Sequence, residues 1–391
     1  MKTSLTIVLL LAVFQVTACK DGGGSDFNNS ANPITEVSAA EKAPATESIV
    51  NSNVESNPSP LNADLTFKHF YDSAHMAYAT YEREECPVSL ELRALADPDT
   101  TEGYFKPAVF IHGGGWVGRP NWQNKEHLVE SVRYLLDRGH IVYYITYRVP
   151  SDTGALDLHI TKNPEAYDCE QHWIEVNKDV SFAINNIANR NPSFPGTSLL
   201  DPEAKIFLSG ASSGAQLAVY FAAHEPTYVQ SVYPVVGTYD FDAMRESAYS
   251  DDDWIENNAG MISLLDAYLG GSFLEEDIGS EFLFENSLSN HYSNEWPKMY
   301  LVNALVDGII PYESVNMFCQ KASEISGQAI ETVIENDDFQ LKSCSPNIML
   351  ETRKKTGHLN SAIPREDLEG ERGLALLSGE FPMPEQSTAT H

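Results

Sequence analysis

The stretch GASSG at residues 210–214 has a serine between two glycines and begins at the last residue of the apolar run at 205–210. A serine hydroxyl is a weak nucleophile at neutral pH, so it needs exposure and a base within hydrogen-bond reach. The pattern G-x-S-x-G provides the exposure through a sharp turn between a strand and a helix. We therefore expect Ser212 to be a nucleophile and the backbone N–H of Ser213 to stabilise an oxyanion. A plain glycine–serine turn is the alternative.

Three successive glycines form a second motif, HGGGW, which begins at His112. Glycines leave backbone N–H groups unobstructed, as the anionic tetrahedral intermediate of acyl transfer requires. We expect Gly114 and Gly115 to donate to the oxyanion together with Ser213, while Gly113 shapes the loop. His112 is expected to brace this loop by hydrogen bonds. A phosphate-binding glycine loop is the rival interpretation, but no Walker lysine follows the glycines.

A histidine is the expected base, and enzymes with this serine turn order their triads as serine, acid, histidine. His358 in KKTGHLNSA comes late in the chain and precedes a helix-like segment. His291 is the competing candidate. His224 lies on the helix predicted after Ser212, about three turns away, and is expected to point elsewhere.

The acid must bind the other imidazole nitrogen and stabilise the imidazolium. Asp307 in LVDGIIP lies just beyond the apolar run at 298–304, which favours it. Asp240 in GTYDFD, after the preceding predicted strand, is the alternative. The segment from Asp307 to His358 is longer than one helix and one strand require, so we expect an insertion at 339–347.

These residues need a scaffold that brings them together. Short apolar runs predict strands, and longer runs with helical spacing predict helices. Their alternation indicates an α/β fold with a mainly parallel central sheet and helices on both faces. The predicted strands are 107–112, 141–147, 205–210, 229–237, 298–304 and about 329–334, and the predicted helices are 125–139, 169–188 and 214–223.

Residues 240–295 interrupt this alternation with a polar and aromatic segment that includes the helical piece 261–270. Such an insertion usually packs over the carboxyl ends of a sheet, where ligands bind. Trp116 and Tyr239 are candidates to line a substrate pocket there, and core packing is an equal alternative for both.

In this order the motifs resemble the α/β-hydrolase superfamily. The closest resemblance is to its HGGGW esterases, which include hormone-sensitive-lipase-like carboxylesterases, bacterial feruloyl and acetyl esterases, and kynurenine formamidase relatives. It covers about 105–377 and rests on HGGGW, TYRVP at 146–150, GASSGAQLA, GTYD, VDGIIP and GH. GASSGA departs from the commoner GDSAGG and GHSAGA, which blurs the subfamily, and Thr146 replaces the usual aspartate of DYR.

The resemblance implies an α/β-hydrolase fold with a cap-like insertion. It also implies hydrolysis of a carboxylic ester through an acyl-enzyme on Ser212, with His358 and Asp307 and with no metal or cofactor. The expected substrate is a small-molecule or polysaccharide-borne ester. An amidase, arylformamidase or peptidase with the same triad is the first alternative, and a catalytically dead, surface-anchored binding scaffold is the second.

The N-terminus has the features of an export signal. Lys2 precedes an apolar run at 5–16 that is short for a membrane span. VTAC then ends at Cys19 and resembles the lipobox of bacterial lipoproteins, which implies removal of residues 1–18 and lipidation of Cys19 as a membrane anchor. Lys20 after the cysteine favours the outer membrane. An ordinary secretory signal is the alternative.

Residues 19–62 are rich in Gly, Ser, Asn and Pro and lack apolar periodicity, so we expect a disordered tether. The hydrolase domain is expected at 63–384 and a short tail at 385–391. The formal net charge of −31 argues against nucleic acid as a partner, because a negative surface repels phosphate. The sequence leaves the oligomeric state open.

Four cysteines remain besides Cys19, and an even number in an exported chain indicates two disulfides. We favour Cys319–Cys344, which closes a short local loop, and Cys86–Cys169. The spacing of these cysteines does not match a zinc site.

Overall fold

The structure is a computed structural model, and it describes residues 65–66, 75–96, 104–116, 132, 134–148, 172–250, 252–274, 280–358 and 378–379. Four expectations lie outside these residues: the signal segment with lipidation at Cys19, the tether at 19–62, the tail at 385–391 and the pairing of Cys86 with Cys169. Among the helices that are described, none has both the length and the apolar character needed to cross a bilayer.

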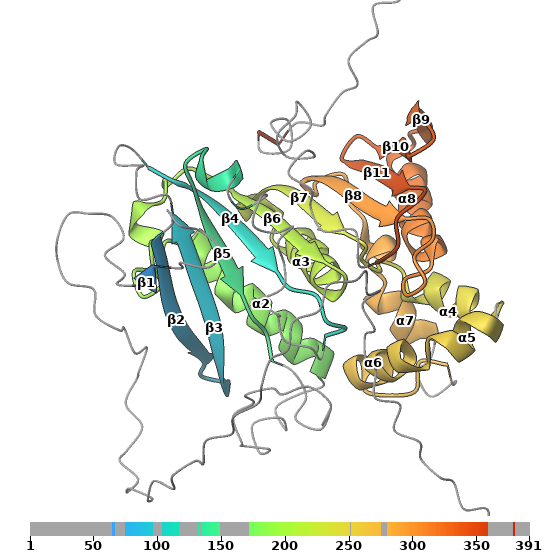
Figure 1. The fold of residues 1–391 in the computed structure, drawn as a ribbon, viewed down its shortest axis with the longest axis horizontal. Coiled ribbons are helices and arrows are strands. Elements are labelled where there is room, and N and C mark those ends of the chain that lie inside the picture. The colour runs from blue at the N-terminus through green and yellow to red at the C-terminus, as the bar shows by residue number, and fades with distance from the viewer. Residues whose placement is uncertain are drawn as a thin grey trace, which may run out of the picture. The chain divides into compact units, whose positions relative to one another are not determined.

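The described strands form a sheet of 11 strands in the order β1-β2-β3-β5-β4-β6-β7-β8-β11-β10-β9 (Figure 1). Its middle is parallel, because β5, β4, β6, β7, β8 and β11 pair in the same direction. The strands at both edges pair antiparallel. The bounds are β1 Leu65–Thr66, β2 His75–Arg83, β3 Cys86–Ala96, β4 Lys106–Ile111, β5 His140–Ile145, β6 Ile206–Ala211, β7 Val229–Val235, β8 Lys298–Ala304, β9 Glu331–Glu335, β10 Phe339–Ser345 and β11 Ile348–Arg353.

The central strands are apolar on both sides and therefore need cover on both faces of the sheet. On β4, Val109 and Ile111 belong to one buried cluster, and Ala108 and Phe110 belong to another. Helices α2 and α3 are neighbours on one face (Figure 1). The helices that contribute to the cluster of Val109 include α2 His172–Ala188, α3 Ser213–His224 and α8 Tyr312–Ser326. The mainly parallel α/β architecture predicted from the sequence is confirmed.

The described residues of 240–295, between β7 and β8, form a helical insertion. On its helix α6, Leu264 packs against Gly115 in the loop that follows β4. The insertion therefore reaches the carboxyl end of a central strand. Its elements are α4 Phe241–Tyr249, α5 Asp252–Asn257, α6 Ala259–Leu269, α7 Ser280–Asn286 and a 3-10 helix at Leu288–His291.

The segment before His358 differs from the sequence prediction. Residues 339–347, expected to be an insertion, form β10 and the turn into β11, and they extend the sheet. The strand predicted near 329–334 is the edge strand β9, whereas the parallel neighbour of β8 is β11. Strand β11 was missed because its second half is polar, although Glu351 and Thr352 are buried. The antiparallel strands β2 and β3 were missed as well.

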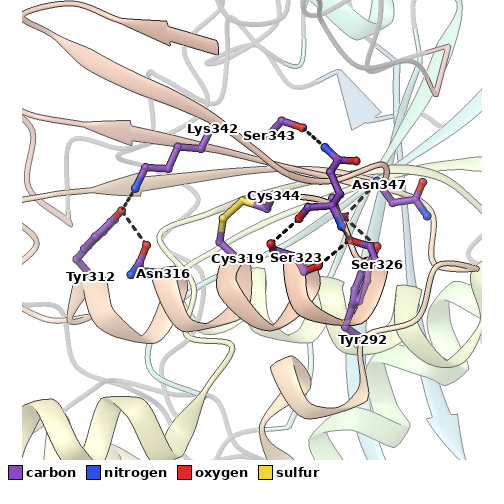
Figure 2. Close-up of a disulfide and its surroundings, with 12 residues drawn as sticks. Tyr292, Tyr312, Asn316, Cys319, Ser323, Ser326, Lys342, Ser343, Cys344 and Asn347 are labelled. Carbon is purple, nitrogen blue, oxygen red and sulfur yellow. Dashed lines mark hydrogen bonds between the residues drawn. A yellow bond between two sulfur atoms is a disulfide. The ribbon is translucent and has the colours of Figure 1, made fainter. Parts of the chain in front are cut away.

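Cys319 on α8 forms the expected disulfide with Cys344 on β10, and both side chains are fully buried (Figure 2). A hydrogen bond joins the same two elements, because Lys342 Nζ donates to the hydroxyl of Tyr312 at 3.1 Å. Helix α8 follows the predicted acid, and β10 pairs with the strand that precedes His358. The disulfide therefore ties together the two chain segments that carry these residues.

Replacing Cys319 and Cys344 together with alanine should lower the free energy of unfolding by about 3 kcal/mol, because a cross-link over 25 residues restricts the unfolded chain. Urea denaturation followed by fluorescence measures the change. As a control, a reductant should lower the midpoint of the wild type much more than that of the double variant. Equal midpoints for the oxidised wild type and the double variant would contradict the stabilising role.

Candidate active site

Ser212 lies between β6 and α3 in a backbone conformation that residues with side chains rarely adopt, with φ 56° and ψ −125°. Backbone atoms crowd the two glycines of the motif. A Cβ atom on Gly210 would lie 2.2 Å from the carbonyl oxygen of Gly214, and one on Gly214 would lie 2.3 Å from that of Ile111. The turn leaves Ser212 partly exposed at the end of a buried strand, as a nucleophile requires.

His358 contacts both Ser212 and Asp307 through its two ring nitrogens. Its Nε2 lies 3.0 Å from Oγ of Ser212, and its Nδ1 lies 2.8 Å from Oδ2 of Asp307. Oδ1 of Asp307 accepts hydrogen bonds from the backbone N–H groups of Ile309 and Ile310 at 2.9 and 3.0 Å. Both carboxylate oxygens are therefore bound. With the proton on Nδ1, His358 donates to Asp307 and accepts from Ser212, which is the arrangement of a general base.

Neighbouring parallel strands bring these residues together from distant parts of the chain. Ser212 directly follows β6, Asp307 lies just beyond β8, and His358 lies just beyond β11. Strands β6, β7, β8 and β11 are consecutive and parallel, so their carboxyl ends share one edge of the sheet. Ser212 and His358 thus meet although 146 positions separate them.

The competing residues are engaged in other contacts. Asp240 caps α4, since its Oδ1 accepts from the backbone N–H of Ala243 at 2.8 Å, and its Oδ2 pairs with Lys321 Nζ at 2.8 Å. His291 is exposed, and its Nε2 lies 2.6 Å from the carbonyl oxygen of Glu285. The described residues include no group of three or more His, Cys, Asp or Glu side chains placed to hold a metal ion.

The glycine loop lies against the serine turn. A Cβ atom on Gly113 would stand 3.1 Å from Cβ of Ser212. Gly114 and Gly115 have φ values of 122° and 62°, which favour glycine. Gly115 is covered by Leu264 of α6, whose Cδ1 is 2.5 Å from the position of a Cβ atom there. The loop is thus fixed beside Ser212 on one side and beside the insertion on the other.

Trp116 and Tyr239 are both buried, which corresponds to the packing alternative for these two residues. The ring of Trp116 stacks on Tyr268 of α6 with centroids 4.4 Å apart, and its Nε1 donates to Oε1 of Gln216 at 3.1 Å. The ring of Tyr239 packs on Phe318 at 5.3 Å, and burial raises the pKa of its phenol. Both rings are therefore part of the core, and that of Trp116 also holds the end of the glycine loop against α3 and α6.

His112 contacts the glycine loop, in line with the bracing role expected from the sequence. Its Nδ1 lies 2.7 Å from the carbonyl oxygen of Gly113, and its ring stacks on that of Tyr147. The sequence alone indicates no role for Tyr147, although this tyrosine belongs to the TYRVP motif that contributes to the resemblance. This motif begins directly after β5, the parallel neighbour of β4, so Tyr147 lies at the same edge of the sheet as the glycine loop. That position in the sequence, at the end of a predicted strand, could have indicated a role at the site.

No protein-family model matches the sequence, and no curated protein matches it. Among solved structures, an acylaminoacyl peptidase aligns with a TM-score of 0.52 and 13% identity over 81% of this chain and 43% of that one. A Rhizomucor miehei esterase aligns with a TM-score of 0.50 and 15% identity over 82% and 83% of the two chains. A prolyl endopeptidase aligns with a TM-score of 0.49 and 14% identity over 76% and 36%.

This chain therefore spans less than half the length of the two peptidases that it matches. At such low identities the similarity establishes the fold. The chain has the α/β-hydrolase fold, as the sequence predicted.

The crowding around Gly214 can be tested directly. Gly214→Ala should lower the free energy of unfolding by about 2 kcal/mol, because the added methyl group would overlap the carbonyl oxygens of Ile111 and His112. Gly308→Ala is the matched control, since nothing lies within 4 Å of a Cβ atom there, and it should change stability by less than about 1 kcal/mol. Urea denaturation of both variants measures the difference. Equal effects would show that the turn tolerates a side chain at 214.

Proposed function

We propose that the protein is a serine hydrolase that cleaves a carboxylic ester through an acyl-enzyme. The observation that carries this proposal is the pair of hydrogen bonds from Ser212 through His358 to Asp307, beside a loop of glycines. The α/β-hydrolase fold supports it, because the order serine, acid, histidine along the chain is the one that this fold uses for a catalytic triad.

In the first half-reaction His358 accepts the proton of Ser212 while Oγ attacks the substrate carbonyl carbon. Asp307 holds the Nδ1–H of the imidazole and stabilises the positive charge that forms on the ring. His358 then donates the proton to the leaving alcohol, and the acyl group stays on Ser212. In the second half-reaction water attacks the acyl-enzyme, His358 accepts a proton from that water and returns it to Ser212, and the carboxylic acid leaves.

The negative charge of each tetrahedral intermediate needs donors that do not move during the reaction. The backbone N–H groups of Gly114, Gly115 and Ser213 are the proposed donors. The close approach of the glycine loop to Ser212 supports this assignment, as does the position of Ser213 at the start of α3. Each such donor typically lowers the barrier by about 3 kcal/mol.

An ester is favoured over an amide as the substrate. The HGGGW motif resembles that of esterases, and the Rhizomucor miehei esterase matches this chain over 83% of its own length. The acylaminoacyl peptidase has the same fold but matches over only 43% of its length. Amide hydrolysis by the same triad is the second candidate. We expect the ester to be carried by a small molecule or a polysaccharide.

A fluorophosphonate probe should label the wild type and fail to label Ser212→Ala, because the probe requires an activated serine hydroxyl. Hydrolysis of p-nitrophenyl acetate should fall at least about a thousandfold in the same variant. Ser250→Ala, which changes an exposed serine outside the triad, should leave both readouts unchanged. The wild type should hydrolyse the ester faster than an arylformamide or a dipeptide anilide. The opposite preference would favour the amidase, and a folded wild type that resists the probe would exclude the serine mechanism.

We also propose that Cys19 is lipidated and anchors the protein to the outer membrane of a Gram-negative cell. The lipobox-like VTAC and the following Lys20 support this location. Cys19→Ser should move the protein from the outer-membrane fraction to the soluble fraction, measured by immunoblot after membrane fractionation. An unchanged distribution would contradict the lipid anchor.

A further inference from the structure

The proposed oxyanion hole is assembled from two separate segments of the chain. Gly114 and Gly115 follow β4, whereas Ser213 begins α3. Donors of this kind act only if they are held within about half an ångström of the productive geometry. A contact that fixes one segment against the other would therefore matter for the reaction.

We propose that the hydroxyl of Tyr147 is a positioning group that ties the glycine loop to the serine turn. This inference deepens the proposed function and rests on it. The Tyr147 hydroxyl donates to the carbonyl oxygen of His112 at 3.1 Å and lies 3.2 Å from Oγ of Ser213. Because its own hydrogen is used on His112, the Ser213 hydroxyl donates to the phenol oxygen. One oxygen atom thus binds both segments, and we call this pair of hydrogen bonds the tie.

The tie lies inside the protein, where water does not compete for its hydrogen bonds. Tyr147, His112 and Ser213 are all buried. Burial raises the pKa of the Tyr147 phenol, so the group stays protonated and remains a donor. The ring of Tyr147 also stacks on that of His112, with centroids 4.2 Å apart and planes 9° apart. Since Nδ1 of His112 is close to the carbonyl oxygen of Gly113, the stack extends the tie to the glycines.

Hydrogen bonds hold the residues on both sides of Tyr147, so its backbone and hence its hydroxyl are fixed in position. On one side, the hydroxyl of Tyr81 donates to the carbonyl oxygen of Thr146 at 2.6 Å. On the other side, Arg148 binds Asp179 through its backbone N–H at 3.1 Å and through its guanidinium at 2.7 and 2.8 Å. This arginine belongs to a buried cluster of two cations and two carboxylates, which are Arg83, Arg148, Glu175 and Asp179.

The tie gives the second serine of GASSG a side-chain role in addition to its backbone N–H. The commoner patterns GDSAGG and GHSAGA have alanine at the position of Ser213, so they lack the hydroxyl that completes the contact. Tyr147 alone would still hold the glycine loop through His112. The hydroxyl of Ser213 connects that assembly to the nucleophile turn.

The test compares Tyr147→Phe, Ser213→Ala and the double variant in ester hydrolysis. Each single variant should lower kcat about tenfold, less than the loss of an oxyanion donor, with KM changed less than about twofold. The double variant should be no slower than the slower single variant, because both changes break the same contact. The affinity for a trifluoromethyl ketone that mimics the tetrahedral intermediate should fall in parallel with kcat/KM, which a loss of stability alone would not cause.

Tyr143→Phe is the matched control. Tyr143 lies on β5, its side chain is buried, and its hydroxyl has no hydrogen-bond partner among the residues that the structure describes. This variant should keep the wild-type kcat and ketone affinity. Ser213→Ala introduces the alanine that the commoner motifs GDSAGG and GHSAGA have at this position, so we expect this variant to fold. It therefore keeps the test valid even if Tyr147→Phe is unstable.

Three results would overturn the inference: an unchanged kcat in Ser213→Ala, a fall in the double variant equal to the product of the single effects, or a ketone affinity that does not follow kcat/KM. Fluorophosphonate labelling of the wild type separates these results from a failure of the proposed function. A wild type that is labelled and active retains the proposed function whatever the tie contributes, whereas an unlabelled wild type removes both.

Discussion

The backbone conformation of Ser212 is the constraint on which the site depends. A residue with a side chain at φ 56° and ψ −125° costs of order 1–3 kcal/mol, so the surroundings must hold it there. The backbone N–H of Ser212 donates to the carbonyl oxygen of Val235 at 2.8 Å, and its own carbonyl oxygen accepts from Ala215 at 2.9 Å. These bonds join the turn to β7 and α3. Only glycine fits at Gly210 and Gly214, because any side chain would overlap the backbone that presses on the turn.

The same tight packing explains why the insertion belongs to the site. Leu264 and Tyr268 on α6 lie against Gly115 and Trp116 respectively. Trp116 and Tyr268 both donate to Oε1 of Gln216, which lies on α3 one turn after Ser212. The insertion, the glycine loop and helix α3 therefore share one buried contact region. A displacement of the insertion would therefore shift the glycine loop, because close-packed interiors transmit displacement.

The sequence predicts the three residues of the candidate triad because each depends on local chemistry: glycines around a sharp turn, an acid just beyond a strand, and a histidine late in the chain. Other features depend on contacts between distant segments. Strand β11 contains polar residues that are buried because of their partners, such as Glu351, whose Oε2 accepts from the hydroxyl of Tyr300 at 2.6 Å. Aromatic composition alone does not separate a pocket wall from a core, so Trp116 and Tyr239 stayed ambiguous. The contacts of Tyr147 join segments that are 35 and 66 residues away.

Asp240 and Asp307 follow neighbouring strands, and their partners give them different roles. Asp240 is fully buried. Without a cation beside it, a buried carboxylate would destabilise the fold, and its charge would also affect the titratable groups nearby. Lys321 pairs with it at 2.8 Å, and the backbone N–H of Ala243 adds a further hydrogen bond, so its charge is compensated where it stands. Asp307 is held by two backbone N–H groups and by Nδ1 of His358. Its charge is compensated further whenever the imidazole gains a proton. In the proposed mechanism, Asp307 would favour the proton transfer from Ser212 to His358, because it contacts the imidazole, whereas Asp240 contacts Lys321 instead.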